Sequence, residues 1–112
     1  MASVNAQIKR GSAELAVLTL LAERPLHGYE IAKQIEEQTG GVLRFDMASL
    51  YPMLHRLEQK MWVQAEWQTL PNGRRRRCYR LTASGRKHIA PLRAQWRAFF
   101  RALESVTGFQ KA

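Results

Sequence analysis

Cysteine is nearly absent from this sequence, and long apolar runs are missing. The single cysteine, Cys78, excludes a disulfide within the chain, which suits a reducing compartment. The longest apolar stretch, residues 15–22, is interrupted by Thr19 and falls far short of the roughly 20 residues that span a bilayer. The N-terminus has no secretory signal pattern. We therefore expect a cytoplasmic protein with no membrane partner.

Patterns that build enzyme or metal sites are also missing. His27, His55 and His88 are scattered, and none has the spacing to a second ligand that a zinc site needs. The sequence has no glycine-rich phosphate loop and no pairing of a nucleophile with a base. Cys78 follows Arg77, which could activate a thiol, but a lone thiol without a resolving partner is more often incidental. These absences predict a protein without catalytic activity, metal or cofactor.

Acidic residues are scarce in the second half of the chain. Residues 1–60 hold equal numbers of acidic and basic residues, whereas residues 61–112 hold eleven Lys or Arg and two Asp or Glu, which accounts for the net charge of +9. Four of these cations form the run at 74–77, and Arg80 follows. A charge run is most often a solvated loop, but adjacent like charges are best tolerated where a polyanion neutralises them. We therefore favour contact with nucleic acid.

A β-hairpin carries the arginine run. Asn72-Gly73 is a strong signal for a two-residue turn, and strand-like residues flank it at 62–68 and 75–81. Alternation places Cys78 on the outer side. The side chains expected on the inner side are Val63, Ala65, Trp67, Tyr79 and Leu81.

Three helices precede the hairpin. The first spans about 12–24, with Ser12 as its N-cap. The second spans about 28–38 and ends at two glycines, and the third spans about 47–60 with Asp46 as its cap. Residues 42–45 are expected to be extended, and they could pair with the hairpin as a third strand. The residues predicted to face the core from the second and third helices are Tyr29, Ile31, Ala32, Ile35, Leu50, Met53, Leu54, Leu57 and Met61.

The third helix holds the residues best placed to read DNA. In a helix-turn-helix the second helix enters the major groove, and its N-terminal residues reach base edges. Alternatively, Ser49 only starts the helix and Tyr51 packs on the second helix. Pro52 lacks an N–H group and fits only near the helix start, so the first turn is either distorted or begins nearer Ser49. The candidate DNA contacts are Ala48, Ser49, Tyr51, Pro52, His55, Arg56 and the hairpin residues Arg74, Arg75, Arg76 and Arg77.

A long amphipathic helix ends the chain, from its cap at Thr82 to about Val106. Pro91 lies inside it and predicts a kink or a break. Its apolar face is too large for a chain of this length to cover, which predicts pairing with a second copy. Arginines on its outer face solubilise the chain, with DNA contact as the alternative. The predicted dimer interface consists of Ile89, Leu92, Trp96, Phe99, Phe100 and Leu103.

Three aromatic residues on this apolar face allow two interpretations. Packing in the core or the dimer is the ordinary role of such a stripe. Alternatively, Trp96, Phe99 and Phe100 line a pocket between two subunits in which a flat aromatic effector stacks.

Three motifs in sequence order resemble the PadR family of bacterial transcriptional regulators. They are residues 26–31 (LHGYEI), 49–54 (SLYPML) and 76–82 (RRCYRLT). Together they make the resemblance specific over residues 8–100. It implies a homodimeric winged helix-turn-helix repressor that binds a palindromic operator in double-stranded DNA. It also implies a C-terminal helix swapped between subunits and a response to phenolic acids, drugs or other small molecules.

Two residues depart from the family pattern. Met61 stands where a glycine usually follows the recognition helix, so a left-handed helix end is less favourable there. Ala48 stands where a glycine often precedes the Ser-Leu-Tyr motif, so the operator sequence does not carry over. The alternative function is a winged-helix adaptor that binds protein or RNA without a small ligand, although RNA readers usually display stacking aromatics.

The sequence thus predicts a mainly α fold with a small β-hairpin, a winged helix-turn-helix followed by a dimerisation helix. We expect an N-terminal tail at 1–11, a DNA-binding domain at 12–81 and the dimerisation helix at 82–112.

Overall fold

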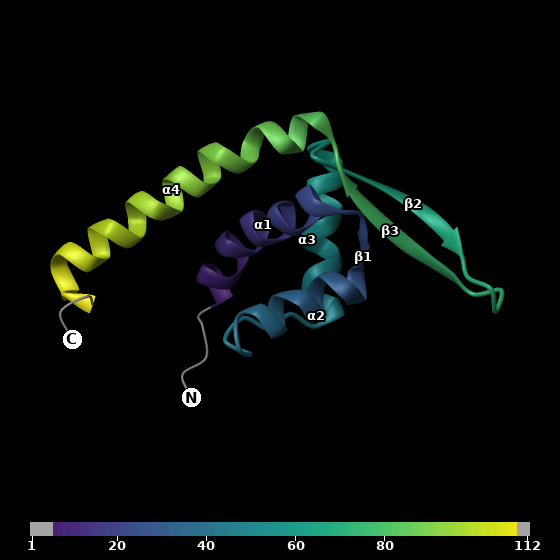
Figure 1. Cartoon of the computed structure of the whole chain (residues 1–112), viewed down its shortest axis with the longest axis horizontal. Helices are drawn as coiled ribbons and strands as arrows, with labels where there is room; N and C mark the ends of the chain where they lie inside the picture. The colour runs from purple at the N-terminus through teal and green to yellow at the C-terminus, as the bar shows by residue number, and fades with distance from the viewer. Residues whose placement is uncertain (1–5, 110–112) are drawn as a thin grey trace.

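Helices dominate the computed structural model, which describes residues 6–109 (Figure 1). The three strands form one antiparallel sheet in the order β1-β3-β2. The fold is therefore mainly α with a small sheet, as predicted. None of the helices in the described part of the chain is long and apolar enough to span a membrane. The elements are α1 (Ala6–Glu23), β1 (Leu26–His27), α2 (Gly28–Gln38), α3 (Met47–Gln59), β2 (Val63–Thr69), β3 (Arg75–Leu81) and α4 (Ala83–Thr107).

Local capping signals set the bounds of α2 and α3, which lie where the sequence predicts them. The Asp46 carboxylate accepts a hydrogen bond from the Ser49 backbone N–H at 2.8 Å and so starts α3 at Met47, before Pro52. Gly40 and Gly41 end α2 in the left-handed region, with φ of 60° and 84°. The helix-turn-helix therefore follows from the sequence almost residue by residue.

The hydrophobic core lies between α1, α2, α3 and the inner side of the sheet. Two residues predicted to face it do not: Tyr29 is 65% exposed and Met61 is 73% exposed. Tyr29 lies in the first turn of α2 and lines an open groove between the helices and the hairpin. The core residues are Ala13, Val17, Leu18, Leu21, Leu26, Ile31, Ile35, Leu50, Met53, Leu54, Leu57, Val63 and Tyr79.

The first helix is longer than predicted. It begins at Ala6 rather than at Ser12, so the expected irregular tail is wrong for residues 6–11. Residues 1–5 lie outside the described residues. A β-carbon at Gly11 would lie 3.2 Å from the Trp96 ring of α4, and the glycine therefore lets α4 approach α1 closely. That tertiary contact, which the sequence pattern does not reveal, accounts for a glycine inside the helix.

The third strand is β1, not residues 42–45 as predicted. Leu26 pairs with Tyr79 and His27 pairs with Cys78, which makes β3 the central strand. Residues 42–45 instead fold back on the end of α2, because Leu43 exchanges hydrogen bonds with the Thr39 hydroxyl at 3.1 and 3.3 Å.

The hairpin loop is longer than the predicted two-residue turn. Thr69 is the residue opposite Arg75, and Leu70 donates to the Arg74 carbonyl at 2.7 Å. Gly73 adopts a φ of 84°, and the Asn72 side chain accepts from the Arg74 N–H at 2.9 Å. A two-residue turn would shift the pairing by one residue and turn Tyr79 away from Ala65. Burial of the inner face therefore sets the register.

The chain leaves α3 through a left-handed residue, Met61, with φ of 64°. The Met61 N–H donates to the Glu58 carbonyl at 2.9 Å, and the Trp62 N–H donates to the Leu57 carbonyl at 3.0 Å. This pair of bonds is the Schellman arrangement, in which glycine is strongly preferred at the left-handed position. Met61 therefore adopts the left-handed backbone conformation that glycine prefers, although it is not glycine.

The last helix is one continuous helix over Ala83–Thr107, so of the two predicted effects of Pro91, a kink or a break, the break does not occur (Figure 1). The Thr82 side chain accepts from the Gly85 N–H at 2.9 Å and starts the helix as predicted. Ile89 and Leu92 pack against the core, while the rest of α4 continues away from the hairpin along α1.

We expect Met61→Gly to raise the free energy of unfolding by about 0.5–1 kcal/mol. Glycine removes the left-handed strain of about 1–2 kcal/mol and adds a smaller entropic cost, and the exposed Met61 side chain loses little packing. Chemical denaturation measures the change. The control is Gln59→Gly in the last turn of α3, where glycine should destabilise by up to about 1 kcal/mol. A loss of stability in Met61→Gly would contradict the expectation.

Candidate nucleic-acid interface

The outward face of α3 consists of the residues predicted to contact DNA. Its inward face is anchored by Leu50, Met53, Leu54 and Leu57, each at most 3% exposed. Tyr51 is 47% exposed, and one edge of its ring lies beside Gly28. The structure therefore leaves the predicted set available to a partner: Ala48, Ser49, Tyr51, Pro52, His55 and Arg56 are all exposed.

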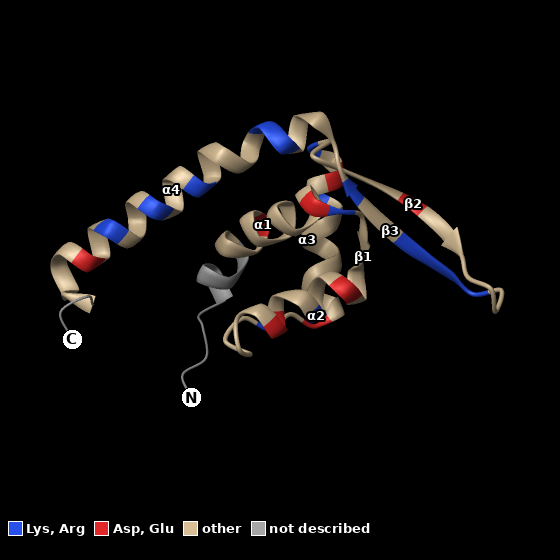
Figure 2. Cartoon of the chain, viewed as in Figure 1, with Lys and Arg blue, Asp and Glu red and all other residues tan. Residues whose placement is uncertain are grey.

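The arginines of the hairpin do not share one environment, although they adjoin in sequence. Figure 2 shows basic residues along β3, which projects from the body of the molecule. Arg77 forms an ion pair with Glu58 of α3 at 2.9 Å, and Arg80 pairs with Glu66 of β2 at 2.9 Å. The hydrogen bond to Glu58 raises the pKa of Arg77. Residues 74–76 are exposed and, within the described residues, have no ion pair with a carboxylate.

An open groove separates the inner face of the hairpin from the N-terminal ends of α2 and α3. It has a volume of about 630 Å³. Tyr29 and Tyr51 line it from the helices, and Trp67 lines it from β2 together with the arginines at 74–77. Aromatic faces and guanidinium groups therefore meet in one concave surface, which suits sugars and phosphates of a nucleic acid.

Sequence reasoning missed Tyr29 and Trp67 as members of this surface. Helical periodicity predicts Tyr29 in the core, and strand alternation predicts only that Trp67 lies on the inner side of the hairpin. The alternation of β2 and β3 does hold a signal for Trp67, because it lies directly opposite Arg77 and shares a face with Arg75. No local pattern indicates that Tyr29 faces this groove.

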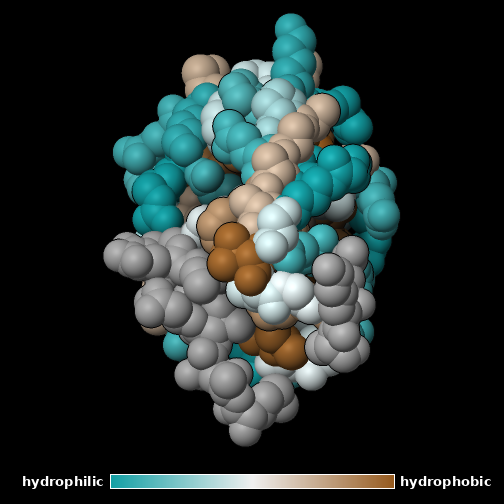
Figure 3. Space-filling model, turned by 90° about the vertical axis from the view of Figure 1, so that its left-hand side faces the viewer, coloured by the Kyte–Doolittle hydropathy of each residue, from teal (hydrophilic) through white to brown (hydrophobic). Residues whose placement is uncertain are grey.

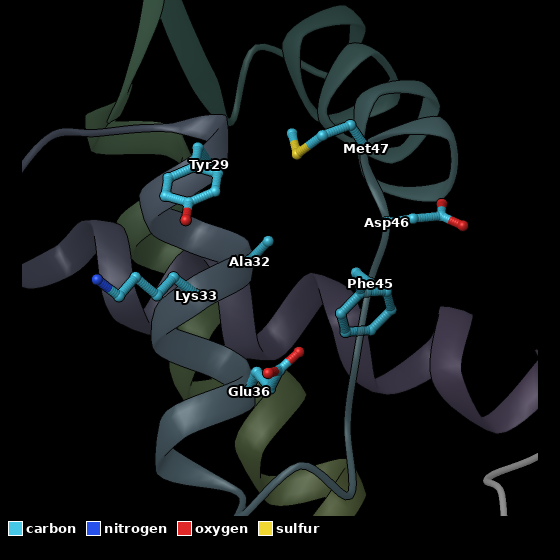
Figure 4. Close-up of a pocket in the computed structure, with 7 residues that line it drawn as sticks. All are labelled: Tyr29, Ala32, Lys33, Glu36, Phe45, Asp46 and Met47. Carbon is cyan, nitrogen blue, oxygen red and sulfur yellow. The ribbon is translucent and has the colours of Figure 1, made fainter.

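A second hollow, of about 370 Å³, lies between α2 and the segment that leads into α3. Figure 4 shows Tyr29, Ala32 and Glu36 on one side and Phe45 and Met47 on the other. Its charged groups are engaged within the chain: Glu36 pairs with Arg44 at 3.2 Å, and the Asp46 carboxylate caps α3 and points away from the hollow.

His27 caps α2 at the edge of the groove. The Glu30 N–H donates to Nδ1 of His27 at 3.4 Å, and the His27 N–H donates to the Glu30 carboxylate at 3.3 Å. Nε2 lies 3.0 Å from the same carboxylate. Burial lowers the pKa of His27, Glu30 opposes that change, and Arg76 adds to it. The neutral imidazole, with Nδ1 as acceptor, is the form that caps the helix.

Cys78 is buried, although alternation puts it on the side of the strand opposite Tyr79. Its cross-strand neighbours are His27 on β1 and Glu66 on β2. Burial raises the pKa of the thiol more than the nearby Arg76 lowers it. The interpretation as an incidental, unreactive cysteine is therefore the one that agrees with the structure. The described residues contain no group of His, Cys, Asp and Glu side chains able to hold a metal.

An aromatic cluster on α4 forms a second candidate surface. The ring centroids of Trp96 lie 5.7 Å from Phe99 and 5.8 Å from Phe100. Phe99 is 48% exposed and Phe100 is 54% exposed. Figure 3 shows a row of tan and brown residues among teal ones on the side where α4 ends. Of the predicted dimer residues, Ile89 and Leu92 already pack on the chain's own core, so the aromatic cluster and Leu103 remain for a partner.

A hollow of about 370 Å³ lies beside this cluster, between α1 and α4. Leu15, Trp96 and Phe100 line it, together with arginines 93, 97 and 101 of α4. It has the apolar wall that an aromatic compound requires. The predicted effector residues Trp96 and Phe100 therefore lie at a cavity, while Phe99 does not line it.

Three comparisons place these features among known proteins. The model of the transcriptional regulator PadR-like family matches residues 17–91. The transcriptional regulator Rv3488 of Mycobacterium tuberculosis is 32% identical over 104 residues, which cover 93% of this chain and 91% of that protein. A transcriptional regulator structure from Clostridium thermocellum has a TM-score of 0.83 at 25% identity, covering 91% of this chain and 99% of its own. A PadR family regulator from Eggerthella lenta has a TM-score of 0.77 at 26% identity, covering 89% and 85%.

The cap at His27 predicts that stability depends on pH. Folding lowers the pKa of His27, so the folded state binds this proton more weakly than the unfolded chain does. The neutral cap therefore contributes fully to the free energy of unfolding above about pH 6.5, and this contribution is lost as the pH falls further. His27→Asn retains a capping acceptor without the titration. We expect its unfolding free energy, measured by denaturation between about pH 8 and pH 5, to fall less than that of the wild type.

His55→Asn on the exposed face of α3 makes the same substitution outside the cap and is the matched control. Equal pH profiles for His27→Asn and the wild type would show that the cap does not couple to protonation.

Proposed function

The chain belongs to the PadR-like family of transcriptional regulators, and from this premise we propose that it is a sequence-specific repressor. It acts as a homodimer on a palindromic operator in double-stranded DNA. Proteins of this family are DNA-binding regulators rather than enzymes. The protein would act in the cytoplasm, where it has access to the operator. The observation that carries it is the groove in which Tyr51 of α3 faces the arginines of the hairpin.

The recognition helix supplies register and sequence in this proposal. The exposed N-terminal face of α3 offers hydroxyl groups of Ser49 and Tyr51 and the imidazole of His55 for base edges and phosphates. Arg56, one position further, reaches the backbone. Because the opposite face of α3 is buried in the core, the helix enters the major groove as a rigid body.

The hairpin, or wing, supplies affinity for the DNA backbone. Arg74, Arg75 and Arg76 are exposed and pair with no carboxylate of residues 6–109, so the release of counterions from DNA favours their binding to phosphates. Arg77 has a smaller part, because its guanidinium is held by Glu58.

A second copy covers the apolar side of α4 in the proposed dimer. Phe99, Phe100 and Val106 are 48%, 54% and 87% exposed, which is unfavourable for a helix that remains in water. The proposed effector, a flat aromatic or phenolic compound, stacks on Trp96, Phe99 and Phe100 near this seam. Binding there would change the separation of the two recognition helices and release the operator.

Replacing Arg74, Arg75 and Arg76 together by Gln should weaken binding to any duplex. Each lost phosphate contact reduces the steepness of the fall of log K with log salt by about 0.9. We therefore expect the magnitude of the slope to decrease by up to about 2.7. Fluorescence anisotropy of a labelled mixed-sequence duplex between about 50 and 200 mM salt measures it.

The control for this experiment is the triple replacement of Arg93, Arg97 and Arg101 by Gln, which removes the same charge from α4. It should leave the slope unchanged. If both triple variants lower the slope equally, net charge and not the wing determines binding.

Replacing Phe99 and Phe100 by Ser should convert the dimer into a monomer, because the apolar area that drives association is removed. Sedimentation velocity measures the mass. In footprints of DNA upstream of the protein's own gene, the wild type should protect two half-sites about one helical turn apart, and the variant should lose that protection. Tyr29→Ser removes an aromatic side chain elsewhere that is 65% exposed, and this variant should remain dimeric. A wild type that sediments as a monomer contradicts the dimer.

A further inference from the structure

Trp67 lies between two arginines on the inner face of the wing. The Cζ atom of Arg75 is 4.9 Å from the centre of its ring, and that of Arg77 is 5.5 Å away. Arg77 is directly opposite Trp67 in the β2–β3 pairing, and Arg75 follows on the same face, nearer the tip of the wing. Both guanidinium groups are therefore within cation–π distance of one indole.

One of these arginines is fixed to the recognition helix. Arg77 donates to the Glu58 carboxylate at 2.9 Å, and both side chains are largely shielded, at 35% and 22% exposure. A line of contacts thus runs from Glu58 on α3 through Arg77 and Trp67 to Arg75. It connects the helix to the outer part of the wing across the side of the groove.

The two neighbouring arginines lack such support. Arg76 points to the opposite side of the strand, because successive residues alternate, and Arg74 lies in the loop before β3. Within the described residues, neither lies over an aromatic ring or in an ion pair. The Trp67 ring itself is 54% exposed, which is unusual for an indole that serves only packing.

We propose that Trp67 is a positioning residue for DNA binding: it holds the Arg75 guanidinium at a defined place relative to α3, so that both engage one duplex. A free arginine side chain loses rotational freedom when it binds a phosphate, and stacking on Trp67 removes part of that freedom beforehand. The inference rests on the proposed function, because it requires that the wing bind phosphates.

A double-mutant cycle tests this role on a fluorescein-labelled mixed-sequence duplex of about three helical turns. Arg75→Gln should lower the salt slope by about 0.9 and weaken binding about tenfold at low salt. Trp67→Leu should cause a comparable loss of slope although it removes no charge. The double variant Trp67→Leu with Arg75→Gln should bind no more weakly than Arg75→Gln alone.

Two further variants distinguish positioning from a general effect on the fold. Trp67→Phe keeps an aromatic face and should restore most of the slope. Arg76→Gln should lower the slope independently, so that its effect adds to that of Trp67→Leu. Thermal unfolding confirms that each variant folds, and Trp67→Thr, which lacks an aromatic face and favours strands, replaces Trp67→Leu if the latter does not fold.

The outcomes separate the inference from the proposed function. If the arginine variants lower the slope but Trp67→Leu does not, or if its effect adds fully to that of Arg75→Gln, Trp67 does not position Arg75 and the inference fails alone. If neither Arg75→Gln nor Arg76→Gln changes the slope, the wing does not bind phosphates, and the proposed contact and the inference fail together.

Discussion

The left-handed turn at Met61 is the constraint on which the rest of the structure depends. Its two backbone hydrogen bonds end α3 and lead the chain directly into β2. The Thr82 hydroxyl lies 2.7 Å from the Met61 carbonyl and 3.0 Å from the Trp62 carbonyl, and Thr82 also caps α4. The end of α3, the start of β2 and the start of α4 therefore lie in one small region, and these contacts fix their directions. A methionine adopts a positive φ, at a cost of about 1–2 kcal/mol, only because these surrounding contacts outweigh the strain.

The arginines of the hairpin differ in ion pairing and exposure because of this geometry. Where β3 passes the body, Arg77 pairs with Glu58 and Arg80 pairs with Glu66, each at 2.9 Å. Further out the hairpin projects from the body (Figure 1), and the arginines at 74–76 are exposed. The arginines adjoin in the sequence, but their environments differ with their distance from the core. Of the inner cations, Arg77 ties the wing to α3 and Arg80 ties β3 to β2, whereas the outer cations form no ion pair within the described residues.

Local signals were sufficient to predict α2 and α3 and insufficient to predict the sheet. Asp46 and the two glycines after α2 act on their own backbone neighbours, so the sequence displays their effect directly. The two residues of β1 pair with Tyr79 and Cys78, far along the chain, and their strand character comes from that pairing. Burial of Tyr79 likewise overrides the turn signal at Asn72-Gly73. The outward face of α3 was predictable from helical period, whereas the groove was not, because it exists only where three distant segments meet.

The connection between wing and last helix bears on how two copies could read one DNA. Only Thr82 separates β3 from α4, and its hydrogen bonds to the end of α3 leave no flexible linker. Ile89 and Leu92 then tie the first half of α4 to the core, while the exposed aromatic half extends away from the wing (Figure 1). A partner that held the exposed half would therefore hold the recognition helix through a rigid path. The separation of two recognition helices would then be set by α4 itself, as recognition of half-sites about 34 Å apart requires.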